Sequence, residues 1–169
     1  MKIVIRVLLV VFVFLFIFGV SRSRAQLFMF GNPLEGKPAP DFTLSTLTKK
    51  AVTMSTYRNG QPAIIFFWAT WCPHCREALA DLNTRSAELE KQGLKIVLVD
   101  VGEVKADVES YLKDHNVTSD VFFDEDSSVS QAYSLVGIPT FYLIDKEGIV
   151  KSVEHALPED YSSLLKAAN

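Results

Sequence analysis

The chain has 169 residues, of which 49 % are hydrophobic, enough for one domain with a sizeable core and a short extension. Its formal net charge is −3, but residues 1–25 hold four basic residues and no acid, which leaves 13 basic and 20 acidic residues in 26–169. This acidic balance argues against nucleic acid as a partner. The sequence has no internal repeat, so nothing in it predicts a second domain.

The N-terminal segment, residues 1–25, predicts export. Apolar residues fill positions 7–20 behind Lys2 and Arg6, and the chain then turns polar up to Ala25. The segment is either a signal peptide cut after Ala25 or a signal anchor, because residues 3–20 would span ~27 Å as a helix if Arg6 snorkels, close to the ~30 Å hydrocarbon core. Either interpretation delivers the remaining chain to the periplasm or the outer face of the cytoplasmic membrane, where disulfides persist.

Residues 26–40 are interpreted as a linker rich in Pro and Gly, whose prolines should prevent regular pairing. The ordered domain is expected to cover 41–169. Short β-prone runs at 42–44 and 51–54 predict that it opens with a small hairpin around residues 48–50.

The middle of the chain predicts a buried strand followed by a helix. Residues 63–68 form an apolar run rich in β-branched and aromatic side chains, which is typical of a buried strand. Helical spacing then continues to about Gln92, and Gly93 supplies a stop. Pro73 falls at the first helical position, where its missing N–H costs nothing. The positions expected on the buried face of this helix are Cys75, Leu79, Leu82, Ser86 and Leu89.

The rest of the chain alternates between strand and helix patterns. We expect a buried strand at 94–101, a helix at 104–115 with Val104, Val108, Leu112 and His115 on one face, a short strand at 121–123, a helix at 128–135, a hairpin of 140–144 with 149–153, and a last helix from about Pro158. This order predicts an α/β fold with a central mixed β-sheet flanked by helices.

The only two cysteines, Cys72 and Cys75, stand in a Cys-Pro-His-Cys sequence at the start of the expected central helix. One helical turn separates them, so they are within reach of a redox-active disulfide. A thiol at a helix N-terminus has a lowered pKa, because the helix dipole and unpaired N–H groups favour the thiolate. We therefore predict Cys72 as the nucleophile. Cys75 would then resolve a mixed disulfide by attacking the Cys72 sulfur.

Pro73 and His74, between the cysteines, are predicted to tune the thiolate. As a cation or hydrogen-bond donor, His74 would stabilise the charged sulfur, although it could also be an exposed polar residue in a turn. Whatever stabilises the reduced thiolate makes the disulfide a stronger oxidant, by about 30 mV per 1.4 kcal/mol. This dipeptide therefore favours oxidising power.

Other roles for the two cysteines stay open. A purely structural disulfide would close so short a loop that it gains little chain entropy. A structural zinc would usually need a second cysteine pair, which the sequence lacks. Copper could be held by the two thiolates together with a distant His115 or His155. We expect no metal and no organic cofactor.

Three motifs carry a family resemblance: Gly-Lys-Pro-Ala-Pro-Asp-Phe-Thr-Leu at 36–44, Phe-Trp-Ala-Thr-Trp-Cys-Pro-His-Cys at 67–75, and the stretch around Gly-Ile-Pro-Thr-Phe at 133–145. Across residues 34–166 the chain resembles the TlpA/ResA-type extracytoplasmic thiol-disulfide oxidoreductases of the redoxin superfamily. The resemblance implies a thioredoxin-like fold with an N-terminal β-hairpin extension.

The same resemblance assigns a substrate-binding surface beside the dithiol. It implies that Pro139 is cis and lies against the cysteines, so that the backbone of Ile138 can pair with an extended substrate segment. An ordinary trans proline before a strand is the alternative. Trp71 would offer an apolar contact surface to the partner, unless it is a plain core residue.

The chain departs from these families at the positions that handle protons. Thioredoxin places a buried Asp where this chain has Phe66, and many TlpA-like proteins carry a Glu where it has Ala78. Glu77 is one position early and would project roughly 100° away on a helix. The proton acceptor for Cys75 therefore stays open, with water or His74 as candidates.

The sequence predicts an exported thiol-disulfide oxidoreductase, anchored or signal-cleaved and monomeric, that exchanges disulfides with protein substrates. By resemblance, these substrates could be apocytochromes in cytochrome c maturation or other exported proteins, with a membrane redox partner for recycling. The Pro-His dipeptide resembles that of DsbA-type oxidases whereas its flanks resemble reductases, so the direction of electron flow stays open. A peroxiredoxin, which would carry Thr or Ser where Ala69 stands, and a non-catalytic interaction domain are the other candidates.

Overall fold

A computed structural model describes residues 31–48, 51–117 and 119–159. The expected export segment, the tip of the first hairpin at 49–50 and most of the expected last helix lie outside these residues. Within them, no helix combines the length and the apolar character needed to cross a membrane.

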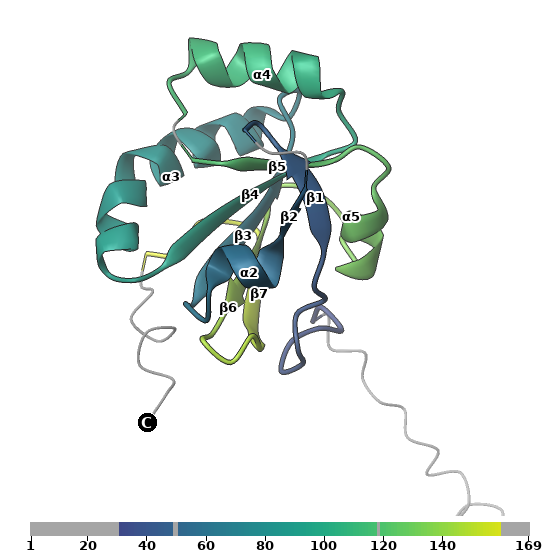
Figure 1. Cartoon of the computed structure of the whole chain (residues 1–169), viewed down its shortest axis with the longest axis vertical. Coiled ribbons are helices and arrows are strands. Elements are labelled where there is room, and N and C mark those ends of the chain that lie inside the picture. The colour runs from purple at the N-terminus through teal and green to yellow at the C-terminus, as the bar shows by residue number, and fades with distance from the viewer. Residues whose placement is uncertain (1–30, 49–50, 118, 160–169) are drawn as a thin grey trace, which may run out of the picture. The chain divides into compact units, whose positions relative to one another are not determined.

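Seven strands of the described chain form one mixed sheet with the order β2-β1-β5-β4-β3-β6-β7 (Figure 1). They are β1 Thr43–Thr46, β2 Val52–Thr53, β3 Ala63–Trp68, β4 Lys95–Val101, β5 Val121–Asp124, β6 Thr140–Ile144 and β7 Val150–Glu154. β3, β4 and β5 run parallel, whereas β6 is antiparallel to β3, β7 to β6, and β1 to both β5 and β2. The predicted α/β fold with a mixed sheet is confirmed.

Helices cover both faces of this sheet. In the described chain they are α2 Met54–Arg58, α3 Pro73–Lys91, α4 Lys105–Asp114 and α5 Ser128–Ala132. α3 and α4 pack on one face, while α2 and α5 lie on the other (Figure 1). The cysteines sit on the α3 face, so this layer contains the chemistry.

Alternate residues of β3 supply two separate cores. Ile64, Phe66 and Trp68 belong to the cluster under α3 and α4, whereas Ile65 and Phe67 belong to the opposite cluster. A strand buried on both faces needs apolar residues at every position, which explains its uninterrupted apolar sequence. The five positions predicted for the inner face of α3 are all buried.

Three details of the predicted elements are wrong. Val104 and His115 are exposed because they cap the two ends of α4 from outside the helix, where they cannot share the inner face of Val108 and Leu112. α5 ends at Ala132, before the predicted end at residue 135, and the chain turns at Ser134, which has a φ of 53°. α2 was not predicted, because five residues are too few to show helical periodicity.

The segment before β1 pairs with the sheet despite its prolines. Gly36 donates its N–H to the carbonyl of Val150 at 2.8 Å, and Ala39 donates to that of Gly148 at 2.8 Å. A bridge also joins Pro38 to the residue before β7. The expectation that these prolines prevent pairing is therefore wrong, because their non-proline neighbours supply the donors.

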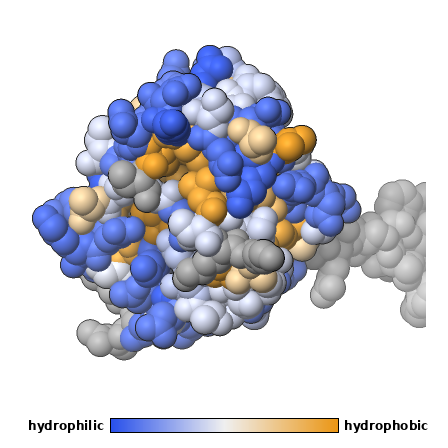
Figure 2. Space-filling model, turned by 45° about the horizontal axis from the view of Figure 1, so that its top comes forward, coloured by the Kyte–Doolittle hydropathy of each residue, from blue (hydrophilic) through white to orange (hydrophobic). Residues whose placement is uncertain are grey.

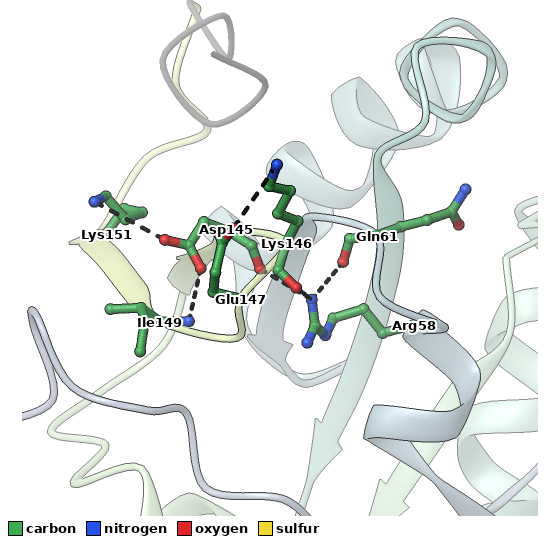
Figure 3. A network of polar contacts seen from close by, with 7 residues as sticks. All are labelled: Arg58, Gln61, Asp145, Lys146, Glu147, Ile149 and Lys151. Atoms are coloured by element: carbon green, nitrogen blue, oxygen red, sulfur yellow. Dashed lines mark hydrogen bonds and ion pairs between the residues drawn. The ribbon is translucent and has the colours of Figure 1, made fainter. Parts of the chain in front are cut away.

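Arg58 joins α2 to the β6–β7 turn, at the end of the sheet opposite the cysteines. Its Nη1 donates to the carbonyls of Gln61 at 2.7 Å, Asp145 at 2.9 Å and Lys146 at 3.0 Å (Figure 3). The Asp145 carboxylate in turn accepts the N–H of Ile149 at 2.8 Å. A single buried guanidinium thus donates hydrogen bonds to three backbone carbonyls, one in the α2–β3 loop and two in the β6–β7 turn.

Candidate active site

The end of β3 and the start of α3 place the two cysteines together. Cys72 is the residue that caps α3, and its Sγ accepts the backbone N–H of Cys75 at 3.3 Å. Pro73 occupies the first position of the helix. Cys72 and Cys75 form a disulfide with their Cα atoms 5.2 Å apart. A sulfur held at this helix end receives the stabilisation that favours a thiolate.

Burial makes the two sulfurs unequal. Cys72 is 6 % exposed and Cys75 is 0 % exposed, so only the Cys72 side chain reaches the surface. Trp71, directly before it, is 65 % exposed and presents an apolar face to solvent. An incoming sulfur can therefore meet Cys72 but not Cys75.

The loop before β6 forms the other wall of the dithiol. The peptide bond between Ile138 and Pro139 is cis, and the Ile138 carbonyl oxygen lies 3.9 Å from Cys72 Sγ. His155 Nδ1 lies 3.2 Å from the Pro139 carbonyl oxygen and 3.2 Å from Thr140 Oγ1. The structure thus brings Ile138 and Pro139 to the cysteines from 66 positions further along the chain.

A cleft of about 410 Å³ opens between the start of α3 and this loop. The contact of His74 here is with Glu77, whose carboxylate lies 3.5 Å from its Nδ1, and both side chains are exposed. The cleft is lined by His74, Glu77, Ala78, Asp81, Pro139 and residues 155–157. Its position beside Pro139 gives an extended polypeptide room next to Cys72.

Two acids that the sequence interpretation missed lie behind the active-site loop. The Glu103 carboxylate accepts both the N–H and the hydroxyl of Thr70, each at 2.5 Å. Asp100 is 0 % exposed and pairs in register with Trp68 at the ends of β4 and β3. Burial, reinforced by the neighbouring Glu103 carboxyl, raises the pKa of Asp100 to about 8. Asp100 could have been identified from the sequence, because it is an acid within the apolar run of β4.

The histidines named in the copper alternative have other contacts. His115 stacks on Tyr111 with ring centroids 3.9 Å apart, and His155 is placed against the loop at Pro139. In the described ranges, no three His, Cys, Asp or Glu side chains gather into a group that could hold a metal ion.

Comparison with known proteins decides the family. Residues 36–153 match the AhpC/TSA family. The chain belongs to this family. It is 36 % identical to the thiol-disulfide oxidoreductase ResA of Geobacillus thermodenitrificans over 118 residues, covering 70 % of this chain and 67 % of that protein. ResA of Bacillus subtilis is 34 % identical over 137 residues, covering 78 % and 76 %.

Solved structures agree with this assignment. A thiol:disulfide interchange protein of DsbE type from Chlorobium tepidum superposes with a TM-score of 0.68 at 28 % identity, covering 79 % of this chain and 91 % of that one. The protein is therefore a thiol-disulfide oxidoreductase of ResA/DsbE type with a thioredoxin-like fold. The predicted enzyme class and fold are confirmed.

Proposed function

We propose that the protein is an exported reductant of disulfides in protein substrates, with Cys72 as nucleophile and Cys75 as resolving cysteine. The Cys72 thiolate attacks a substrate disulfide, one substrate sulfur leaves as a thiolate, and a mixed disulfide forms. Cys75 then attacks Cys72 Sγ, which releases the second substrate sulfur and closes the enzyme disulfide. The substrate gains two electrons and the enzyme loses them.

The difference in burial between the two sulfurs carries this proposal. Cys72 is open at one side, beside the exposed Trp71, while Cys75 is closed off completely. A structural disulfide needs no such asymmetry. An exchange enzyme does, because the substrate must reach one sulfur while the other waits inside.

Negative charge around the dithiol supports the reducing direction. Glu103 is hydrogen-bonded to Thr70, two residues before Cys72, and Glu77 pairs with His74. Carboxylates near a thiol disfavour its thiolate. They therefore lower the oxidising power that Pro73 and His74 would otherwise give.

The compartment and partners of this proposal rest on the N-terminal sequence and on the family resemblance. Residues 1–25 would direct export of the chain and would then either be cleaved off or anchor the chain in the membrane. Substrates would be cysteine pairs in exported proteins, apocytochromes in cytochrome c maturation among them. A membrane redox partner would reduce the enzyme again, and the enzyme would work as a monomer.

A trapping experiment tests the proposal. In Cys75→Ser, the mixed disulfide at Cys72 cannot be resolved, so a substrate-linked species should accumulate on non-reducing gels and vanish with a reductant. Cys72→Ser is the matched control and should trap nothing. If both variants trap alike, or neither does while the wild type reduces no model disulfide, the proposal fails. Rapid peroxide consumption that depends on Cys72 would instead indicate a peroxidase.

A further inference from the structure

Asp100 is a buried acid that the exchange chemistry described so far does not use. It is the penultimate residue of β4, follows the apolar residues 96–99, and lies in register with Trp68 on β3. Alternation along β4 puts it on the same face as Ile96 and Leu98, which pack in the cluster that contains Trp68 and Cys75. Asp100 therefore faces the layer that holds the resolving cysteine.

The surroundings of Asp100 do not support an isolated negative charge. Its side-chain oxygens are buried, and the neighbour that shares hydrogen bonding with them is another acid, Glu103. The charged groups that act on it are acids, Glu103 on the following loop and Asp124 on β5. From the two helices above, Arg76 of α3 is engaged with the Thr70 carbonyl at 3.2 Å, and Tyr111 of α4 packs on Trp68. The protonated form of a carboxyl group is favoured in such a place, because burial destabilises the charged form.

Glu103 connects this acid to the active-site loop. Both of its carboxylate oxygens accept hydrogen bonds from Thr70, one from the backbone N–H and one from the hydroxyl. Thr70 is two residues before Cys72. A change in the charge of Asp100 or Glu103 therefore alters the electrostatic potential close to Cys72.

The resolving step creates a need for such a group. Cys75 is completely buried and must lose its proton before it can attack Cys72 Sγ. The two positions where related families carry an acid for this purpose hold Phe66 and Ala78. Glu77 and His74 are exposed and paired with each other, so they do not fill the gap.

We propose that Asp100, supported by Glu103, accepts the proton of Cys75 during resolution and returns it when the enzyme is reduced. This inference rests on the proposed exchange function. As the Cys75 Sγ–Cys72 Sγ bond forms, the bond from Cys72 to the substrate breaks, the electron pair leaves with the substrate sulfur, and the Cys75 proton moves to the Asp100 carboxylate. In the reverse reaction the departing Cys75 thiolate recovers that proton.

The oxidised state seen here agrees with this assignment. The disulfide is closed, so Asp100 should hold the proton it has received. Its pKa of about 8 keeps it mostly protonated at neutral pH. An acid poised within about one unit of the working pH can both accept and donate a proton.

A single-turnover experiment tests this inference. Reduced full-length protein is mixed with a model disulfide, which forms a mixed disulfide at Cys72. The rate at which the second thiol is then released is measured between pH 5 and pH 9. Asp100→Asn should slow this release by about 10²-fold at pH 7 and remove the lower pH-dependent phase. Glu103→Gln should keep that phase but move its midpoint to lower pH, because a charge that raises the pKa of Asp100 is lost. Asp107→Asn, an exposed acid in the first turn of α4, is the matched control and should leave rate and profile unchanged.

The first step, mixed-disulfide formation at Cys72, separates the two proposals. If the wild type forms no mixed disulfide, the exchange function fails. If all variants form it and Asp100→Asn resolves with the wild-type rate and pH profile, the inference about Asp100 is overturned. Melting temperatures of the variants identify a folding defect, and the Glu103→Gln midpoint supplies the deciding result should Asp100→Asn be unfolded.

Discussion

Burial gives two chemically identical cysteines different tasks. They are three residues apart, yet the helix turn leaves Cys72 at the surface and encloses Cys75. The same principle distinguishes the acids, since Glu103 accepts two hydrogen bonds from Thr70 whereas Asp100 is completely buried. At this scale, reactivity is set by what surrounds a side chain more than by its type.

Asp100 should make stability depend on pH. In the unfolded chain its pKa is near 3.8, and in the native chain it is about 8. Between these values the native state binds one more proton, so the free energy of unfolding falls as pH rises. Relative to Asp100→Asn, the wild type should lose about 3 kcal/mol between pH 5 and pH 8. Urea unfolding of both oxidised proteins at the two pH values measures this, and parallel curves would contradict the assignment.

The long elements were predicted closely, whereas among the short helices α2 was missed and α5 was predicted three residues too long. β3 and α3 show strong apolar patterns, and their bounds and inner faces match the prediction. α2 and α5 have five residues each, so tertiary contacts rather than periodicity determine them.

The cysteine motif and the loop at Pro139 could be predicted because each is encoded by a short stretch of consecutive residues. The contact of Thr70 with Glu103 joins residues 33 positions apart, and that of Arg58 with Asp145 joins residues 87 apart. No pattern in one sequence encodes such pairings. The contact of Glu103 with the active-site loop was missed for this reason, whereas Asp100 was overlooked although it stands as an acid within the apolar run of β4.

Arg58 should be the main polar contribution to holding α2 on the sheet. Arg58→Ala removes one donor from each of three carbonyls, two of them in the β6–β7 turn (Figure 3), where the Asp145 carbonyl keeps the N–H of Gly148 at 3.0 Å. We expect a loss of about 3 kcal/mol in the free energy of unfolding. Arg58→Lys should recover only part of it, because a point charge cannot reproduce the planar fork. Lys91→Ala, at the exposed end of α3, is the control, and an equal effect of both alanine changes would contradict the role of Arg58.

The described domain presents a mixed surface on the side of α4. Figure 2, which turns this side toward the viewer, shows apolar side chains gathered between hydrophilic ones. The large hydrophobic residues exposed in the described chain are Trp71, Val104 and Val136. Trp71 adjoins the nucleophile, so a partner that covers it would also exclude water from the exchanging sulfurs.

Trp71→Ala should therefore weaken substrate binding more than the chemistry. We expect the rate of mixed-disulfide formation with a folded protein substrate to fall by about tenfold, since an exposed aromatic side chain of this size contributes roughly 1–2 kcal/mol at an interface. The rate with a small disulfide such as oxidised glutathione should hardly change. Val136→Ala is the control. Equal losses with both substrates would contradict a docking role.

As a whole molecule, the protein is proposed to work as a reductant through Cys72 and Cys75. The reduction potential of this pair tests this proposal most directly, measured by equilibrating the full chain with glutathione or dithiothreitol buffers and counting free thiols. The acids around the dithiol predict a potential near that of thioredoxin, about −270 mV, whereas a value near that of DsbA, about −120 mV, would contradict the account and mark the protein as an oxidase.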